Sequence, residues 1–212
     1  MTVATATVLR AADLHYAREG RTILDGVSLE AAAGTSTAVM GPSGSGKSTL
    51  LALLAGLERP DRGTVETAVP REEVGLVLQG HGLISLLTAE ENVALPLQAA
   101  EQRVPAREVR RRARAALADV HLADVADHLV EALSGGQQQR VAVARALVID
   151  PRLILADEAT ASLDAENRET VLDLLFARVA TGTTLILATH DEHVAARADR
   201  VLHITDGRLA PA

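Results

Sequence analysis

The spacing of apolar residues along the chain predicts a regular succession of strands and helices. Short apolar segments, several with every second position apolar, are typical of strands. Longer segments with apolar residues three and four positions apart are typical of helices. The predicted strands are Val8–Leu14, Ile23–Glu30, Thr35–Met40, Val65–Val69, Val74–Leu78, Leu153–Ala156, Thr183–Ala188 and Arg200–Thr205. The predicted helices are Lys47–Leu57, Glu90–Ala100, Pro105–Val120, Gly135–Leu147, Ala165–Ala180 and Glu192–Ala198.

The order of these elements predicts an α/β fold. Strands alternate with helices in the last third of the chain, which indicates a largely parallel sheet covered on both faces. Residues 88–147 contain predicted helices only, so we expect them to form an insertion. We predict a single domain over residues 1–212, with a core of about 1–87 and 148–212 and a helical subdomain of about 88–147. The Asp206-Gly207 pair predicts a turn after the last strand.

The composition excludes several classes of protein. The 212 residues are 48% hydrophobic, which is enough for one large core and rules out wholesale disorder. The absence of cysteine excludes disulfides, cysteine-ligated zinc and thiol catalysis. We expect neither a membrane span nor a secretory signal, because the chain has no long uncharged apolar run and no basic start followed by an apolar segment.

The net charge and its distribution bear on which class of partner the protein binds. A net charge of −7 argues against a general nucleic-acid binder, which needs a basic surface. The cluster Arg107–Arg114 can contact lipid headgroups or nucleic acid, or it can be a solvated helix face. We favour the solvated face, because no aromatic residues accompany it to stack on bases. Lys47 is the only lysine among 21 basic residues, and a compact ammonium is not replaceable by a planar guanidinium in a tight pocket.

Lys47 lies in a glycine-rich segment that matches the phosphate-binding pattern G-x-x-x-x-G-K-[ST], between a predicted strand and a predicted helix. Glycines let backbone N–H groups converge on phosphate oxygens, and the helix N-terminus adds its positive end. We predict that Lys47 contacts the β- and γ-phosphates and that Ser48 binds Mg²⁺ through its hydroxyl. The predicted phosphate-binding residues are Gly41, Pro42, Ser43, Gly44, Ser45, Gly46, Lys47, Ser48 and Thr49.

Charged and polar residues follow two of the later predicted strands. Asp157 and Glu158 end a buried strand, at the edge of an α/β sheet where ligands collect. We predict that Asp157 holds the magnesium shell and that Glu158 polarises a water. His190 follows the strand Thr183–Ala188, where it is either a structural histidine or a hydrogen-bond partner of a γ-phosphate. We favour the phosphate contact.

A second anion site is predicted at Leu133-Ser134-Gly135-Gly136-Gln137. Ser134 is a good helix N-cap, and the two glycines leave bare amides at the start of a helix. Because the first loop already holds one set of phosphates, this second site is best used on the nucleotide of another subunit.

The combination of these segments resembles the ATP-binding-cassette ATPases, whose signature is L-S-G-G-Q. The match covers nearly the whole chain in order, at Tyr16, Gly41–Thr49, Gln79, Leu133–Gln137, Leu155–Glu158, Ser162–Asp164 and His190. The resemblance implies an α/β P-loop NTPase fold with a mostly parallel sheet core, a small antiparallel β subdomain and an inserted helical subdomain. It also implies an ATP hydrolase that uses ATP and Mg²⁺.

The same resemblance implies roles for individual residues. Two cassettes stack head to tail, and each signature closes over the ATP of the partner. Glu158 is the general base, His190 contacts the γ-phosphate, Gln79 contacts Mg²⁺ or the attacking water, Tyr16 stacks on adenine, Asp164 crosses the dimer interface, and Ser134, Gly135, Gly136 and Gln137 bind the partner's nucleotide. Two departures stand out: Ala159 replaces the family's usual proline, and only fifteen residues separate Gly63 from Gln79. We expect a looser loop at Ala159 and a smaller antiparallel sheet.

Residues Gln79–Val93, followed by Leu95-Pro96-Leu97, look like the group of lipoprotein-releasing, macrolide-exporting and cell-division cassettes. This implies a homodimer of cassettes with a separate transmembrane permease subunit, in the cytoplasm on the inner face of the cell membrane. Contact with the membrane is then only through that partner, and no nucleic acid is bound. Two alternatives are a soluble cassette ATPase, which needs coiled-coil insertions or tandem cassettes, and a P-loop metabolite kinase, which has no use for Leu133–Gln137.

Overall fold

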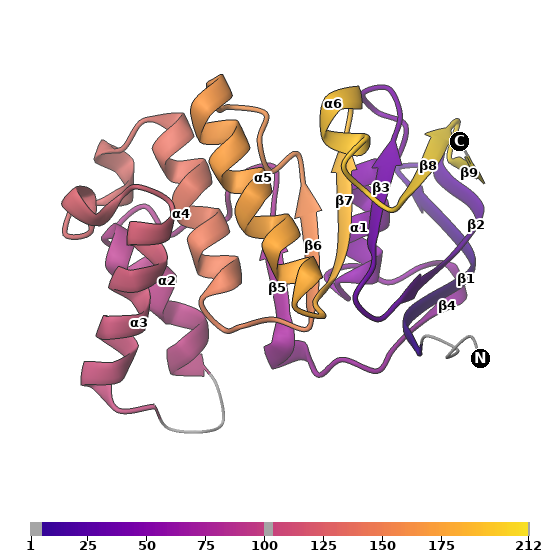
Figure 1. The fold of residues 1–212 in the computed structure, drawn as a ribbon. Helices are drawn as coiled ribbons and strands as arrows, with labels where there is room; N and C mark the ends of the chain where they lie inside the picture. Colours follow the sequence, from indigo (N-terminus) through magenta and orange to yellow (C-terminus); the bar gives the residue numbers. More distant parts are fainter. Residues whose placement is uncertain (1–5, 100–103, 212) are drawn as a thin grey trace.

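The computed structural model describes residues 6–99 and 104–211, and these form two sheets with helices around them (Figure 1). The six-stranded sheet has the order β5-β6-β7-β3-β8-β9, in which the first five strands are parallel and β9 is antiparallel to β8. Its strands are β3 (Ser36–Met40), β5 (Val74–Val77), β6 (Leu153–Asp157), β7 (Thr184–Thr189), β8 (Arg200–Thr205) and β9 (Arg208–Pro211). The α/β fold with a mostly parallel sheet is confirmed.

A smaller antiparallel sheet lies beside the last strands of the large one (Figure 1). It has the order β2-β1-β4, with β1 at Thr7–Arg18, β2 at Arg21–Ala32 and β4 at Arg62–Thr67. The hairpin of β1 and β2 is longer than the apolar pattern predicted. The residues near the turn of the hairpin show little alternation between polar and apolar positions, so the pattern did not predict them as strand. They nevertheless pair across the hairpin as far as Arg18 with Arg21.

The helices cover both faces of the large sheet. Helix α1 (Lys47–Leu54) packs with the antiparallel sheet on one face, in an apolar cluster that includes Leu50, Leu24 and Ile186. On the opposite face, α4 (Gly135–Leu147), α5 (Ala165–Ala180) and α6 (Glu192–Ala195) lie on the sheet in an apolar cluster with Ile154 and Leu185. Helices α2 (Ala89–Ala99) and α3 (Ala106–Asp119) extend this cluster by packing on α4.

The segment between β5 and β6 contains α2, α3 and α4, which gather at the end of the molecule away from the antiparallel sheet (Figure 1). Helix α4 begins with a capping box, because Ser134 Oγ accepts from Gln137 N while Gln137 Oε1 accepts from Ser134 N. Three short 3₁₀ turns complete the elements, at Arg71–Glu73, Ala123–Val125 and Val130–Ala132.

Several predicted boundaries were wrong, for local reasons. The helix predicted to Leu57 ends at Leu54, just before Gly56, whose φ of 66° ends the helical conformation. The strand predicted at Val65–Val69 lies at Arg62–Thr67, where it pairs with β1. Strand β9 was not predicted, although the turn that precedes it was. Ala100, the predicted end of a helix, lies outside the described residues.

Within the described ranges, no helix is both long enough and apolar enough to cross a membrane.

Candidate functional site

The glycine-rich loop connects the end of β3 to α1. Lys47 is 7% exposed, and its ammonium donates to the carbonyl oxygens of Gly41 (2.7 Å) and Pro42 (3.0 Å). Gly46 has a φ of 106°, and a Cβ there would lie 2.8 Å from Leu24 Cδ2, so only glycine fits this turn. Of the other predicted residues, Ser45 is buried, Gly41 and Thr49 are half-buried, and Pro42, Ser43, Gly44 and Ser48 are exposed.

The order β6-β7-β3 brings the predicted acidic residues to the edge of the sheet that carries this loop. Asp157 is the last residue of β6 and is 5% exposed. Burial raises the pKa of its carboxyl group above the usual value, and the neighbouring charge of Glu158 acts in the same direction. Ser48 and Lys47 lie close enough to oppose this shift in part. The loop and the acidic strand end therefore form one site.

Two buried polar atoms of this site have no hydrogen-bond partner in the described part of the chain, Ser45 Oγ and Asp157 Oδ1. A buried polar atom without a partner costs free energy, so such atoms are normally satisfied by a ligand, an ion or water. A hydroxyl inside a phosphate loop matches a phosphate oxygen, and a free carboxylate oxygen matches Mg²⁺. The residues present therefore fit a nucleotide with its magnesium ion.

Glu158 and His190 are in contact. Strands β6 and β7 pair in parallel up to Asp157 and Ala188, so the residues that follow them meet at the sheet edge. His190 Nδ1 lies 2.8 Å from Glu158 Oε1, and the backbone N–H of Glu158 donates to Ala188 O. The Glu158 side chain is 11% exposed and that of His190 is 65% exposed. A nearly buried carboxylate is thus oriented by an imidazole that faces solvent.

The start of α4 lies beside the segment after β6. A Cβ on Gly136 would approach Ser162 O to 3.1 Å, whereas Gly135 faces open space. Asp164 caps α5, since its carboxylate accepts from Asn167 N (2.9 Å). Helix α4 packs on one face of the sheet and α1 on the other. The two predicted anion sites therefore begin helices that pack on opposite faces of the sheet.

Gln79 and Tyr16 lie outside the phosphate loop, each on a different part of the fold. Gln79 is exposed in the turn after β5. Tyr16 is half-buried on β1 and pairs with Leu24, the residue that Gly46 approaches. The strand that carries the aromatic ring is therefore separated from the phosphate loop by one strand, β2.

Two residues near Gln79 were not singled out from the sequence as functional. Asn92 is fully buried; its Oδ1 accepts from Ile84 N, and its Nδ2 donates to the carbonyls of Ile84, Leu87 and Thr88. Arg145 donates to the carbonyls of His81 and Gly82. The signal for Arg145 was available, because it is the one charged residue in the apolar run Val141–Leu147.

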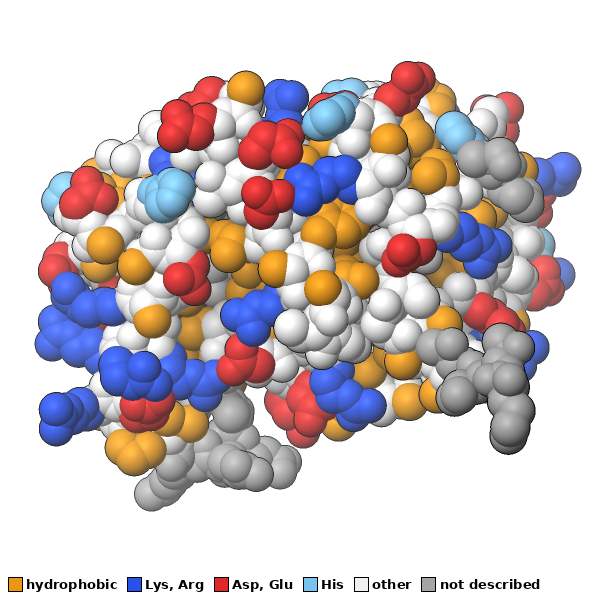
Figure 2. Space-filling model, viewed as in Figure 1, with side chains coloured by type: hydrophobic (Ala, Val, Ile, Leu, Met, Phe, Trp, Pro, Cys, Tyr) orange, Lys and Arg blue, Asp and Glu red, His pale blue; other side chains and the backbone are white. Residues whose placement is uncertain are grey.

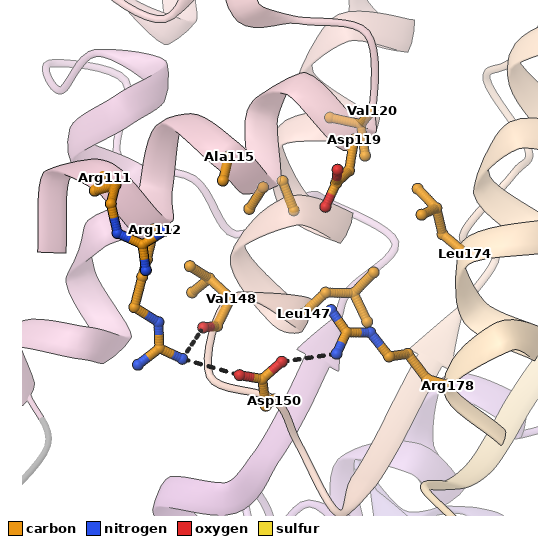
Figure 3. A pocket seen from close by; sticks show the side chains of 12 residues that line it. Arg111, Arg112, Ala115, Asp119, Val120, Leu147, Val148, Asp150, Leu174 and Arg178 are labelled. Carbon is orange, nitrogen blue, oxygen red and sulfur yellow. Dashed lines mark hydrogen bonds and ion pairs between the residues drawn. The ribbon is translucent and has the colours of Figure 1, made fainter. Parts of the chain in front are cut away.

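The arginine cluster of α3 is visible as a blue patch over that helix (Figure 2). Most of its charge is matched by carboxylates: Arg110 and Arg114 pair with Glu90, Arg114 also with Asp127, Arg111 with Glu108, and Arg112 with Asp150. Figure 3 shows that Asp150 also binds Arg178 of α5, beside a cavity of about 200 Å³ between α3, α4 and α5. These pairs are those of a solvated helix face.

Comparison with known proteins decides the family. The model of the family described as ABC transporter matches residues 24–161. The chain belongs to this family.

Similar proteins and similar solved structures support the same family. The chain is 39% identical to the uncharacterized ABC transporter ATP-binding protein YknY of Bacillus subtilis, over 90% of this chain and 88% of the relative. It is 44% identical to the macrolide export ATP-binding/permease protein MacB of Hyphomonas neptunium over 88% of this chain, but spans only 31% of that protein. A dimeric post-hydrolysis structure of the ATP-binding cassette MJ0796 with ADP and Pi matches with a TM-score of 0.89 and 35% identity, over 96% of this chain and 98% of that chain. The chain is an ATP-binding cassette and an ATP hydrolase.

The raised pKa of Asp157 predicts a conflict between stability and function in this cassette. The folded state binds a proton at Asp157 more tightly than the unfolded chain does, so the Asp157 contribution to the free energy of unfolding rises as the pH falls through the folded pKa. Above that pKa the buried, ionised carboxylate is destabilising. We expect Asp157→Asn to raise the free energy of unfolding of the nucleotide-free cassette by about 0.5–2 kcal/mol, while Mg²⁺-dependent ATP hydrolysis is lost.

Denaturant unfolding at neutral and mildly acidic pH measures this effect. The gain from Asp157→Asn should shrink as the pH is lowered, because the wild-type carboxyl then takes up its proton. Asp119→Asn, at an exposed carboxylate, is the control. An Asp157→Asn cassette that is less stable than wild type at neutral pH contradicts this account.

Proposed function

We propose that two copies of this cassette close around two ATP molecules and drive a separate transmembrane permease subunit. The observation that carries this proposal is the position of the two predicted anion sites. The phosphate loop precedes α1, the signature Ser134–Gln137 begins α4, and the two helices pack on opposite faces of one sheet. A signature so placed suits the nucleotide of a second cassette. The MJ0796 cassette, a structural neighbour at 36% identity over 95% of this chain and 96% of that chain, is described as dimeric.

We assign the nucleotide-binding roles as follows. Lys47 and the backbone of the loop Gly41–Thr49 hold the phosphates of ATP. Ser48, Asp157 and Gln79 hold Mg²⁺, which neutralises negative charge on the phosphates when it is bound. The unpartnered Ser45 Oγ and Asp157 Oδ1 support this assignment.

Glu158 acts as the general base, taking a proton from the attacking water on its carboxylate. The hydrogen bond that Glu158 Oε1 accepts from His190 Nδ1 holds the carboxylate in one orientation. Because the His190 ring is largely exposed, it also remains accessible to a γ-phosphate. General base catalysis needs a carboxylate held in one position, and Glu158 is such a carboxylate, nearly buried at the end of β6.

Tyr16 stacks on adenine, and the signature residues complete the site of the partner. Tyr16 is the aromatic residue of β1, and its pairing with Leu24 puts it next to the strand that underlies the phosphate loop. Asp164, which caps α5 beside the signature, crosses to the second cassette. Residues 88–147 form the helical subdomain of a single domain over 1–212, whose core is about 1–87 and 148–212.

The permease docks on an apolar surface next to Gln79. A groove of about 330 Å³ is lined by β5, α2 and α4, with Leu78, Leu95, Pro96 and Ile149 among its residues. Leu86, in the loop between Gln79 and α2, is 76% exposed. Exposed large apolar side chains and apolar grooves are both typical of a protein interface. Through this contact the cassette lies on the cytoplasmic face of the membrane.

Replacing Leu86 tests this docking surface. We expect a tagged wild-type cassette, purified from the detergent-extracted membranes of its own cells, to bring an integral membrane protein with it, and Leu86→Glu to lose that protein. ATP hydrolysis by the isolated variant should be unchanged, since the Leu86 side chain is largely exposed and is not one of the assigned site residues. Leu57→Glu is the matched control, because Leu57 is also an exposed leucine (50%) but follows α1, which packs on the opposite face of the sheet from α4. Equal retention of the membrane protein by both variants contradicts the proposed surface.

A further inference from the structure

Arg145 joins the signature helix to the loop that carries Gln79. It lies near the C-terminal end of α4, the helix that begins with the signature at Gly135. Its guanidinium donates to two successive carbonyl oxygens, Gly82 O at 2.5 Å and His81 O at 2.8 Å. These carbonyls belong to residues two and three positions after Gln79. One side chain therefore spans from the helix of one nucleotide site to the loop of the other.

The loop is shaped for this contact. His81 and Gly82 both have a φ of 59°, the left-handed conformation, which turns two successive carbonyls toward α4. A Cβ on Gly82 would lie 3.2 Å from Leu78 Cδ1 and 3.4 Å from Arg145 Nη2, so glycine permits the close approach. At its far end the same loop is held by the buried amide of Asn92, which binds Ile84 and Leu87. Between Gln79 and Ile84, the side-chain hydrogen bonds to this loop in the described part of the chain come from Arg145.

Two arginines of α4, Arg140 and Arg145, bind backbone carbonyls in place of carboxylates, and Arg140 donates to Val120 O and His121 O. Four arginines of α3 pair with carboxylates, as Arg112 does with Asp150 (Figure 3). Arg145 has no carboxylate within 4 Å among residues 6–99 and 104–211, and it lines the apolar groove with Leu95 and Pro96. Burial lowers the pKa of its guanidinium, which nevertheless stays charged, since arginine is protonated at all physiological pH values. Burying a charge without an opposite charge beside it costs free energy, which the hydrogen bonds to the two carbonyls offset in part.

We propose that Arg145 is a positioning residue for ATP hydrolysis, which fixes the loop of Gln79 against the signature helix. This inference rests on the proposed role of Gln79 at Mg²⁺ and the attacking water. A planar guanidinium can donate to two carbonyls at once, so it holds the loop in one position along α4 and not merely near it. Movement of the signature helix toward a partner's nucleotide then moves the Gln79 loop with it. Because Arg145 also lines the groove, an occupant of the groove contacts the same link.

The test uses Arg145→Gln and Arg145→Lys in the full-length cassette. We expect kcat for ATP hydrolysis to fall by roughly 10–100-fold in both, because a displacement of about 1 Å in a catalytic arrangement can cost about 10²-fold. The dissociation constant for ATP, measured by equilibrium dialysis, should stay close to wild type, since the phosphate loop is untouched. Lysine retains the charge but not the two-pronged geometry, so it should preserve the fold without restoring kcat.

Arg112→Gln is the matched control. Arg112 also donates to a backbone carbonyl of the same helix region, Val148 O at 2.7 Å, and it too is half-buried, but it lies on the side of α4 facing α3 and α5 (Figure 3). Its loss should lower the thermal unfolding midpoint without a specific loss of kcat. An Arg145→Gln cassette with wild-type kcat overturns the proposal. So does a loss of activity that simply follows thermal stability across the Arg112 and Arg145 variants. If Arg145→Gln fails to fold, the kcat of Arg145→Lys decides between these outcomes.

The proposed function can fail separately. If Gln79→Ala hydrolyses ATP at the wild-type rate, the assignment of Gln79 is wrong, and an effect of Arg145 then has another cause. If Gln79→Ala is slow while both Arg145 variants are as fast as wild type, only the role of Arg145 is contradicted.

Discussion

The Glu158→Gln cassette should bind ATP normally and hydrolyse it about 10²–10⁴-fold more slowly than wild type, which is the usual contribution of a general base. An amide occupies nearly the same space as the carboxylate but cannot accept a proton from water. Asp157, Lys47 and the phosphate loop are unchanged by this substitution, so the affinity for ATP should be retained. The measurement is single-turnover hydrolysis with saturating ATP.

The same variant should accumulate as an ATP-bound dimer. If hydrolysis is what opens the pair of cassettes, blocking hydrolysis keeps them closed, and size-exclusion chromatography with ATP and Mg²⁺ should report a doubled mass. The matched control is Glu169→Gln, which also removes a carboxylate from a Glu–His pair, with His193 Nε2 at 3.4 Å from Glu169 Oε1. That variant should turn over as wild type does. Wild-type hydrolysis by Glu158→Gln contradicts the assignment of the base.

Mixing two inactive cassettes should restore part of the ATPase activity. Lys47→Ala removes the ammonium from the phosphate loop, and Ser134→Arg places a large side chain at the start of α4. Each variant alone should be inactive, because both sites of its homodimer carry a lesion. In a mixed dimer the two lesions fall in one shared site, and the other site is intact. Activity on mixing, measured as phosphate release, is therefore expected.

Ser134→Ala separates the steric block from the loss of the helix cap. It removes the hydroxyl that accepts from Gln137 N, which costs about 1 kcal/mol of stability, but it leaves room for a nucleotide. We expect Ser134→Ala to be less stable than wild type and to remain active. Wild-type hydrolysis by Ser134→Arg, or no activity on mixing, contradicts a signature that acts on the partner's nucleotide.

Much of the local structure could be predicted from the sequence, because it depends on neighbours in the chain. The apolar run Leu153–Ala156 and the periodic segment Ala165–Ala180 are a strand and a helix in the structure, within one residue of their predicted bounds. Ser134 caps α4 through a residue three positions away. The glycine loop before Lys47 follows a strand and begins a helix, as the spacing of its residues requires. Capping, turns and periodicity are short-range effects, so a single sequence carries them.

The order of the strands in the sheet, in contrast, could not be predicted from local patterns in the sequence. The contact between Glu158 and His190 joins residues 32 positions apart, and it exists because β6 and β7 are neighbours in the sheet. No local pattern states which strands pair, since each apolar strand could lie beside several others. Strand β9, a short segment containing a proline, is likewise a strand only because the edge of β8 is available to it.

The sequence by itself predicted the chemistry of the site, from a glycine-rich loop with its lysine, two carboxylates, a histidine and a second glycine-rich helix start. Only the tertiary structure decided how these pieces are held. It buried Asp157 until its pKa rose, and it oriented Glu158 through His190. It also connected the Gln79 loop to α4 through the hydrogen bonds that Arg145 donates. The physical reason is that desolvation and long-range hydrogen bonds depend on which segments pack together. Packing is decided by the whole core at once, and not by any one stretch of the chain.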